Sequence, residues 1–431
     1  MNNMVTFAVC GCGIRGLEAY AAYQKHHPEE MKLVAGADIR PERLKLLQTE
    51  YQVPESKCFS SSDELLDQPK LADVMIIATQ DKQHAAEALR ALEKGYHLLL
   101  EKPVSPDLQE CIALQKKAHE TNRAVIVCHV LRYTSFYKTI HDLICNGAIG
   151  KLESVDAVEH VAYWHYCHSF VRGNWRRESS ASPMILAKSC HDMDILRWLI
   201  GEKCLRVSSF GSLDHFTEQN APEGAARRCM DGCRQKEDCP FDAEKIYIEN
   251  KQSGFLHIGP QWPCTVLDSF PTKESLYEAI ITGPYGRCVY HCDNDVVDHQ
   301  VVAMEFKNNI TATFTMSAFT EDCHRTIKIM GTRGEIEGDM EECILRIRRF
   351  GKTEEIINLK ESLPSTGTEE NFAGHGGGDL RMMSAVCRLI SSGEHEALTS
   401  IDVSIESHIM ALAAEASRRT NGRVIELETF S

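Results

Sequence analysis

A glycine-rich turn near the N-terminus constrains the fold of this chain more than any other feature. The apolar run at residues 6–10 leads directly into Gly11-Cys12-Gly13-Ile14-Arg15-Gly16, which opens a helix-like segment. Such glycines permit a tight turn, let a phosphate approach the backbone and allow the helix to pack closely on the strand. Asp38 ends the next apolar run about 20 residues later, where an acid can bind a ribose hydroxyl. Together these features predict a dinucleotide-binding fold rather than a chance glycine turn.

The acid also indicates which dinucleotide is preferred. Asp38 would repel a 2′-phosphate, which favours NAD over NADP, whereas Arg40 two residues later softens that preference. The helix that follows Gly13 offers unpaired N–H groups to a pyrophosphate. The cofactor-binding residues that we expect are Gly11, Gly13, Ile14, Arg15, Gly16, Asp38, Ile39, Arg40, Ala78, Thr79, His84, Glu101 and Lys102.

Residues 1–130 alternate short apolar runs with helical patterns, which predicts a doubly wound parallel sheet in a first domain. Pro41 and Pro106 are expected in the first turns of their helices. The expected strands are 6–10, 33–37, 73–78, 97–100 and 124–130, and the expected helices are 14–25, 41–49, 81–94 and 106–121.

Residues 131–431 contain segments in which polar and apolar residues alternate, which predicts a second, α/β domain with a mainly antiparallel sheet. Residues 212–262 are irregular and rich in Cys, Gly and Pro, which is typical of an insertion. The helices at 379–420 are expected to pack back on the first domain. The expected strands are 152–161, 278–282, 301–306, 311–317 and 325–330, and the expected helices before the last pair are 134–146 and 191–200.

Composition excludes several classes of protein. The chain has 431 residues with a formal charge of −15, so it lacks the basic surface that nucleic acids or anionic membranes attract. The N-terminus shows no secretory signal, and no apolar stretch reaches the ~18 residues of a membrane helix. The 18 cysteines mostly stand singly in apolar segments. Free thiols of this kind indicate a reducing, cytoplasmic location.

A further motif follows the apolar strand at 97–100, at the edge where open α/β sheets bind ligands. It reads Glu101-Lys102-Pro103. A lysine facing that crevice can stabilise a developing alkoxide. Alternatively, Lys102 is a surface lysine before a turn.

The glycine turn, the acid and the Glu-Lys-Pro motif, in this order, resemble the glucose–fructose oxidoreductase/inositol dehydrogenase (Gfo/Idh/MocA) family. The resemblance continues in Leu131-Arg132-Tyr133, in Gly150-Lys151-Leu152 and through residues 184–201. It implies a Rossmann domain followed by an α/β domain whose large open antiparallel sheet forms the oligomer interface, with the active site between the domains. A homodimer or homotetramer is therefore expected.

The resemblance also implies roles for individual residues. His191 takes the position of the general acid/base and Lys102 that of the assisting lysine, so that both manage a hydroxyl proton during hydride transfer. Asp194 either orients His191 or pairs locally. Many members carry Asp four residues before the histidine, where this chain has Ala187. Lys188 instead creates a Lys-x-x-His-Asp pattern, which resembles a subgroup of the family and joins the expected catalytic set.

Residues 163–177 are dense in aromatic, imidazole and guanidinium groups, which suit sugar hydroxyls and C–H faces. An oligomer-interface loop would use the same residue types. His375 opens a glycine-rich segment that is either a lid, a substrate contact or a linker. The expected substrate-binding residues are His129, Arg132, Tyr133, Trp164, His165, His168, Arg172, Trp175, Arg176, Lys188, His191 and His375.

Three cysteines in the insertion, Cys229, Cys233 and Cys239, lie near Cys264 and His215 in the sequence. Clustered thiols can bind structural zinc, but this spacing lacks the two-residue knuckle of zinc sites, so free or redox-paired thiols are favoured over a metal site.

These observations lead to one principal hypothesis and two alternatives. The principal one is an NAD-dependent oxidoreductase acting on a secondary hydroxyl of a sugar or polyol. The first alternative is a glycosidase of the same family, which retains NAD, oxidises the sugar transiently, eliminates the aglycone and returns the hydride. The second is a regulator that binds a dinucleotide without catalysis.

Overall fold

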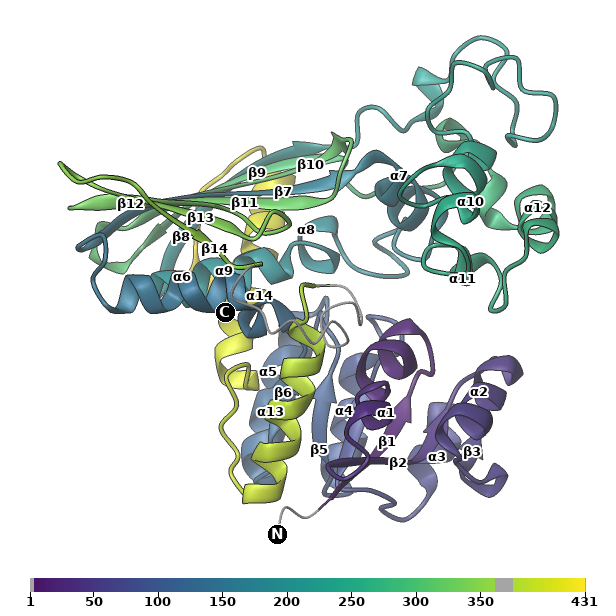
Figure 1. Ribbon diagram of the computed structural model, residues 1–431, viewed down its shortest axis with the longest axis horizontal. Coiled ribbons are helices and arrows are strands. Elements are labelled where there is room, and N and C mark those ends of the chain that lie inside the picture. Colours follow the sequence, from purple (N-terminus) through teal and green to yellow (C-terminus); the bar gives the residue numbers. More distant parts are fainter. Residues whose placement is uncertain (1–3, 361–374, 431) are drawn as a thin grey trace.

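The computed structural model describes residues 4–360 and 375–430. Two sheets organise the chain: a six-stranded sheet near the N-terminus and a nine-stranded sheet that follows it (Figure 1). Helices α13 (Gly378–Ser392) and α14 (Ile401–Arg419) return to the first sheet, with α13 alongside its strands and α14 between the two sheets. In the described part of the chain, every helix is too short or too polar to cross a membrane.

The first sheet is entirely parallel and has the strand order β3-β2-β1-β4-β5-β6. The order reverses between β1 and β4, and ligands bind at the carboxyl ends of strands around such a point. The predicted Rossmann fold is confirmed. Its strands are β1 (Val5–Cys10), β2 (Met31–Ala37), β3 (Cys58–Phe59), β4 (Val74–Ile77), β5 (His97–Leu100) and β6 (Val125–Val127).

Helices cover both faces of this sheet. Pro41 occupies the first turn of its helix, as predicted. The same prediction for Pro106 is wrong, because Asp107 caps the next helix by accepting hydrogen bonds from the backbone N–H groups of Gln109 and Glu110. The helical elements are η1 (Ile14–Ala21), α1 (Tyr23–His26), α2 (Pro41–Tyr51), η2 (Glu55–Lys57), α3 (Ser62–Asp67), α4 (His84–Glu93), α5 (Leu108–Thr121) and η3 (Val130–Tyr133).

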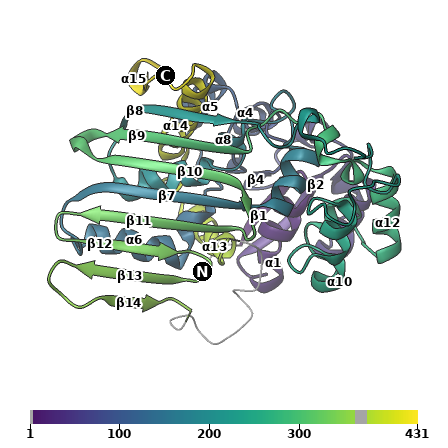
Figure 2. The ribbon, with the colours of Figure 1, turned by 90° about the horizontal axis from the view of Figure 1, so that it is seen from above.

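The second sheet has the order β14-β13-β12-β11-β7-β10-β9-β8-β15 and is antiparallel except between β7 and β10. Its strands alternate buried and exposed residues, as expected for a sheet with one covered face. Helices α6 (Ser135–Cys145), α9 (Cys190–Ile200) and α14 (Ile401–Arg419) lie behind the strands in Figure 2. The strands are β7 (Leu152–Ala162), β8 (Cys204–Ser212), β9 (His299–Phe306), β10 (Thr311–Thr320), β11 (His324–Gly331), β12 (Gly334–Asp339), β13 (Ile344–Arg349), β14 (Glu355–Asn358) and β15 (Ile425–Glu426).

The insertion expected at residues 212–262 is longer in the structure. It runs through residues 213–298, here called the insertion, and contains only short elements. The strand predicted at 278–282 is wrong, because these residues end α12 (Lys273–Thr282), whose start is fixed by a capping box at Thr272. The other elements are η5 (Glu218–Asn220), η6 (Lys245–Glu249), α10 (Phe255–Ile258), α11 (Cys264–Leu267), η7 (Pro284–Gly286) and η8 (Val289–His291).

The C-terminal helices connect the two halves of the molecule. Apolar residues of α13 (Gly378–Ser392) join the core on one face of the Rossmann sheet. Ser400, at the start of α14, forms a bridge with Ile126 of β6. The imidazole Nε2 of His408 on α14 accepts a hydrogen bond of 2.8 Å from the backbone N–H of Val104. The last helix is α15 (Leu427–Phe430).

Candidate active site

The glycine turn has three positions with different steric demands. A Cβ on Gly11, whose φ is +90°, would lie 2.4 Å from the carbonyl oxygen of Ala78. A Cβ on Gly16 would lie 2.0 Å from the carbonyl oxygen of Gly11. Both positions therefore require glycine for packing. A Cβ on Gly13 would instead meet no atom within 4 Å, which leaves open space at the start of η1. This arrangement fits a pyrophosphate resting on the helix N-terminus.

Asp38 follows β2, beside the turn. Its carboxylate accepts hydrogen bonds from the backbone N–H groups of Cys12 (2.8 Å) and Arg40 (2.9 Å), which fix the side chain. The Arg40 Nε lies 3.6 Å from the same carboxylate. The side chain of Ile39 is 84% exposed. A fixed acid beside an exposed apolar side chain suits the ribose and adenine of a dinucleotide.

The Arg15 guanidinium connects three elements behind the turn. It donates to Glu101 at the end of β5 (2.6 Å), to Asp379 in the first turn of α13 (2.6 Å) and to the hydroxyl of Tyr20 (2.6 Å). Burial disfavours ionisation of Glu101, but the charges of Arg15 and Lys102 hold the pKa of this carboxyl below its ordinary value. Arg15 therefore links the glycine turn to the end of β5 and to the start of α13.

Lys102 extends from the end of β5 to the second domain. Its Nζ donates a 2.9 Å hydrogen bond to the carbonyl oxygen of Ala187, at the end of α8 (Met184–Ala187). The next residue, Pro103, has its carbonyl oxygen 2.7 Å from the Nδ1 of His84. Lys102 therefore lies at the junction of the domains. Ala187, which it contacts, is four residues before His191 in the sequence.

His191 lies in the first turn of α9 and is 4% exposed. Its Nδ1 is buried without a hydrogen-bond partner among the described residues. Burial and, next, the charge of Lys102 lower the pKa of this imidazole well below 6.5. The rings of His375 and His129 lie 5.5 Å and 5.9 Å from it, between centroids. At neutral pH this is an uncharged imidazole that can accept a proton.

Lys188 belongs to a buried ionic network that was not predicted. Its Nζ lies 3.2 Å from Glu159 at the end of β7. Glu159 also pairs with Arg325 of β11, which donates a 2.9 Å hydrogen bond to Asp192. Because Glu159 and Arg325 lie in strands whose alternating pattern is ordinary, no local sequence signal marks them; only the pairing of β7 with β11 brings them together.

Several of the predicted substrate-binding residues have structural partners at the domain boundary. Arg132 forms two hydrogen bonds with Asp194, of 2.7 and 2.6 Å. Asp194 therefore pairs with Arg132 instead of orienting His191. The hydroxyl of Tyr133 lies 3.3 Å from Thr399. His129 is fully buried, and neither ring nitrogen has a hydrogen-bond partner among the described residues, although its Nε2 lies 3.9 Å from Asp194. Burial lowers its pKa to about 3.

The aromatic segment divides into two groups. Three of its side chains point to the insertion: Trp164 donates to Gln252 (3.1 Å), His168 contacts the Tyr247 hydroxyl (3.1 Å), and Arg172 is fully buried. These side chains lie in α7 (Tyr163–Tyr166) and η4 (Cys167–Arg172).

Trp175 lies on the side of the Rossmann domain, because its indole donates a 3.1 Å hydrogen bond to Asp81, after β4. His165 is only partly buried, and its Nδ1 lies 3.3 Å from the Sγ of Cys323. Desolvation and, next, the charge of Lys188 lower the pKa of its imidazole well below 6.5. Arg176 pairs with Asp293 near the surface. Asp81 was missed by the sequence analysis, although its place at the carboxyl end of a parallel strand was a usable signal.

Comparison with known proteins agrees with this geometry. Residues 5–129 match the model of the Gfo/Idh/MocA oxidoreductase family, NAD-binding Rossmann fold, and residues 141–427 match that family's C-terminal α/β domain. The chain belongs to this oxidoreductase family. Its N-terminal domain is thus an NAD-binding Rossmann domain, and the residues around Gly13 and Asp38 fit the cofactor.

The individual relatives described next share at most 28% of their residues with this chain. The chain is similar to the putative oxidoreductase YteT of Bacillus subtilis, at 28% identity over 71% of this chain and 70% of YteT. It is 28% identical to glycosyl hydrolase family 109 protein 1 of Bacteroides fragilis, over 41% and 39% of the two chains. Five further curated relatives are covered over 39–53% of their own length, that is, about half or less. A levoglucosan dehydrogenase bound to NADH and levoglucosan shares the fold, with a TM-score of 0.70 at 17% identity over 98% and 99% of the chains.

The different environments of the glycines make a prediction for cofactor binding. Gly13→Ala is expected to preserve the melting temperature, because its Cβ meets no atom, but to lower NADH affinity about tenfold (about 1.4 kcal/mol) by filling the pyrophosphate space. Gly16→Ala is the matched comparison, and it is expected to reduce the yield of folded protein. Fluorescence titration with NADH measures the affinity. Unchanged NADH affinity in Gly13→Ala would contradict the proposal that the open space beside Gly13 holds the pyrophosphate.

Proposed function

We propose that this protein transfers a hydride between NAD and a secondary hydroxyl of a sugar or polyol. The observation that carries the proposal is the approach of Lys102 to the segment that leads into His191: the ammonium contacts the carbonyl oxygen of Ala187, and its charge depresses the pKa of the imidazole. A cation and a neutral imidazole beside a Rossmann cofactor site are what oxidation of a carbinol requires. Relatives named as sugar and polyol dehydrogenases support the same substrate class.

The proposed roles follow from charge. The nicotinamide, when bound, supplies the hydride acceptor or donor. His191 removes the hydroxyl proton in the oxidative direction and returns it in reduction. Lys102 stabilises the alkoxide that develops on the same oxygen. Lys188, held by Glu159, adds positive potential on the side of the second domain. His165, Trp175 and His375 are proposed to contact the sugar.

Replacement of the lysine tests the proposal. Lys102→Met is expected to lower kcat/KM with an active sugar or polyol, selected from a panel, by about 10²–10⁴, while NADH titration stays within twofold of the wild type. Lys151→Met is the control, because that lysine is exposed and remote from the junction. Undiminished turnover in Lys102→Met would remove the proposed role and favour a non-catalytic dinucleotide-binding regulator.

The pH profile tests the histidine. Because burial and Lys102 lower the pKa of His191, kcat/KM for oxidation is expected to stay level from neutral pH down to 6.5 and to fall only below it. The sign follows from protonation: the base is lost only when the pH drops below its depressed pKa. His191→Asn should abolish that acidic limb together with most of the activity. An apparent pKa above 6.5 in the wild type would contradict this role.

A glycosidase is the second candidate, favoured by the similarity to the glycosyl hydrolase family 109 protein. It would use the same lysine and histidine for transient oxidation, so the site geometry suits both activities. Incubation with nitrophenyl glycosides and no added NAD distinguishes them. The dehydrogenase is expected to release no nitrophenol and to reduce added NAD stoichiometrically with sugar. Release of nitrophenol without net NADH would establish the glycosidase instead.

We also propose that copies of this chain associate through the outer face of the nine-stranded sheet. Exposed apolar residues lie on that sheet, among them Phe210, Val301 and Phe319. Exposed apolar side chains gathered on one sheet are typical of association surfaces. The mass of the native assembly tests this proposal, and a monomer would overturn it.

A further inference from the structure

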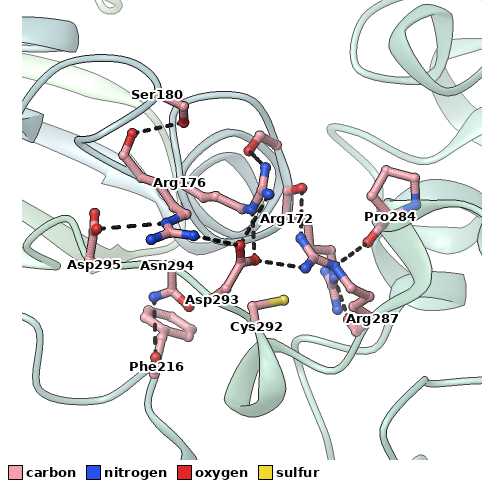
Figure 3. Close-up of polar contacts among 12 residues, drawn as sticks. Arg172, Arg176, Ser180, Phe216, Pro284, Arg287, Cys292, Asp293, Asn294 and Asp295 are labelled. Atoms are coloured by element: carbon pink, nitrogen blue, oxygen red, sulfur yellow. Dashed lines mark hydrogen bonds and ion pairs between the residues drawn. The ribbon is translucent and has the colours of Figure 1, made fainter.

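The two arginines of the aromatic segment (residues 163–177) that were expected to bind a sugar are held by the protein itself. Arg176 donates to Asp293 at 2.8 Å, and Arg287 of the insertion donates to the same carboxylate at 2.8 Å (Figure 3). Arg172 is 1% exposed, and its Nε donates to the carbonyl oxygen of Arg287 at 2.8 Å. Both guanidinium groups therefore anchor the insertion, and other side chains of the segment remain to bind a ligand.

His165 differs from these arginines, because one of its ring nitrogens is open to a ligand. The side chain is partly exposed, and its Nδ1 lies 3.3 Å from the Sγ of Cys323. Its Nε2 has no hydrogen-bond partner among the described residues and is not one of their buried unpartnered atoms, which include both ring nitrogens of His129. The Nε2 therefore faces solvent, where a ligand can reach it. The other residues of the segment that were expected to bind a sugar are buried or bonded to the protein: Trp164, His168 and Trp175.

Ring contacts connect His165 with the carboxyl edge of the Rossmann sheet. The Phe170 ring lies 6.4 Å from the imidazole and 6.5 Å from the Trp175 indole, between centroids. Trp175 in turn donates to Asp81, after β4. The imidazole is thereby joined through two ring contacts to the edge where a dinucleotide is expected to bind.

The second sheet connects the same imidazole with the charged residues around His191. Cys323 directly precedes β11 and stands two residues before Arg325. Side chains two residues apart in an extended chain point to the same side. Arg325 donates to Asp192, the residue after His191, at 2.9 Å. The thiol that contacts His165 thus belongs to the sheet face that carries the ionic network of the candidate active site.

The hydrogen bonds of Cys323 determine which nitrogen of His165 carries the proton. The backbone N–H of Ala162 donates to the Sγ at 3.3 Å, so the sulfur already acts as an acceptor. The thiol proton has one acceptor among the described residues, which is the Nδ1 of His165. A neutral imidazole carries its proton on one nitrogen and accepts at the other. With Nδ1 as the acceptor, the proton is on Nε2, the nitrogen that faces solvent.

Burial keeps both groups of this pair neutral. Burial raises the pKa of the Cys323 thiol, and burial followed by the charge of Lys188 lowers the pKa of His165 well below 6.5. A thiolate–imidazolium pair would require the opposite shifts. Near neutral pH the contact is therefore S–H···N, and the Nε2–H group is a permanent donor.

Two tryptophans restrict the orientation of the imidazole. The Trp262 ring of the insertion crosses it at an interplanar angle of 76°, with centroids 4.8 Å apart, and the Trp164 ring lies 5.7 Å away at 25°. Trp262 is itself partly exposed. Its indole adds apolar surface beside the Nε2–H donor, a combination that suits the C–H and hydroxyl groups of a sugar.

We propose that Cys323 is a positioning residue that holds His165 in its Nε2–H tautomer, and that this N–H donates a hydrogen bond to a hydroxyl oxygen of the sugar. The inference rests on the proposed function, because the ligand is the same sugar or polyol. No proton leaves either group: the thiol proton stays between Sγ and Nδ1, and the imidazole proton stays on Nε2. Proton transfer remains with His191, so His165 and Cys323 act on substrate affinity.

Two amide substitutions identify the nitrogen that meets the sugar. His165→Gln places an N–H near the position of Nε2, whereas His165→Asn places its amide near that of Nδ1. With the best substrate among myo-inositol, levoglucosan and D-glucose, His165→Gln is expected to stay within about threefold of the wild-type KM and His165→Asn to raise KM about tenfold. The kcat of both is expected to change less than about threefold, because a contact made equally in the ground and transition states affects binding alone. Equal KM values in the two variants, or the reverse order, would overturn the proposal.

The role of Cys323 is tested through the tautomer itself. In NMR spectra of the protein with isotope-labelled histidine, the signal that His165→Gln lacks belongs to His165, and it is expected to show a protonated Nε2 and a bare Nδ1. Cys323→Ala is expected to convert this signal to a mixture of tautomers and to raise KM about fivefold at constant kcat. Cys323→Ser keeps a donor and is expected to restore both. Cys145→Ala is the matched control, because it removes an exposed thiol 3.6 Å from the Nε2 of His141, and it should alter neither.

The two measurements separate this proposal from the proposed function. If none of the named compounds is oxidised, the hydride-transfer proposal fails, while the NMR spectrum still decides the role of Cys323. A charged imidazole or a protonated Nδ1 in the wild type, or an unchanged spectrum in Cys323→Ala, would overturn that role. An unchanged KM in Cys323→Ala, with the tautomer altered, would overturn the contact between His165 and the sugar.

Discussion

The junction between the two domains depends on one partly buried guanidinium. Arg15 leaves the glycine turn and binds Glu101, at the end of β5, and Asp379, at the start of α13. Each of these acids is held ionised against the cost of burial by this partner, which raises the penalty for separating the three elements. The glycine turn, which is proposed to hold the dinucleotide, the strand that presents Lys102 and the helix that follows His375 are thus fixed relative to one another.

A second ion pair, which is buried, also connects the two domains. Arg132 follows β6 and binds Asp194 on α9, the helix that carries His191. The imidazole is thereby held against the Rossmann domain without being hydrogen-bonded to Asp194. Its low basicity results from burial and from the neighbouring charges, chiefly Lys102. The nitrogens of the neighbouring His129 have no hydrogen-bond partner among the described residues.

Burial explains why the aromatic segment supplies two kinds of residue. Up to Arg172 its side chains mostly pack into the insertion, where Tyr247 and backbone carbonyls satisfy them. Trp175 instead reaches Asp81 on the first domain. Residue types suited to a sugar are equally suited to anchoring an irregular insertion. Sequence composition alone therefore did not separate the two groups.

Prediction from the sequence succeeded where the cause is local. Glycines, an acid and a lysine at the ends of apolar strands depend on turn geometry and strand topology, so the Rossmann domain could be inferred, and the cofactor site proposed, from the sequence. It failed at 278–282, where a short apolar pattern fits a helix or a strand equally well until the capping box at Thr272 is considered.

The amino-acid sequence by itself determined the family, the parallel sheet and the position of the dinucleotide, because these follow from steric demands within a few residues. Only the tertiary structure decided which charges meet. Lys188 with Glu159, Arg325 with Asp192 and Arg172 with Cys229 come from segments far apart in the chain. Electrostatic partnership depends on distance and burial, and both are set by packing after the chain has folded.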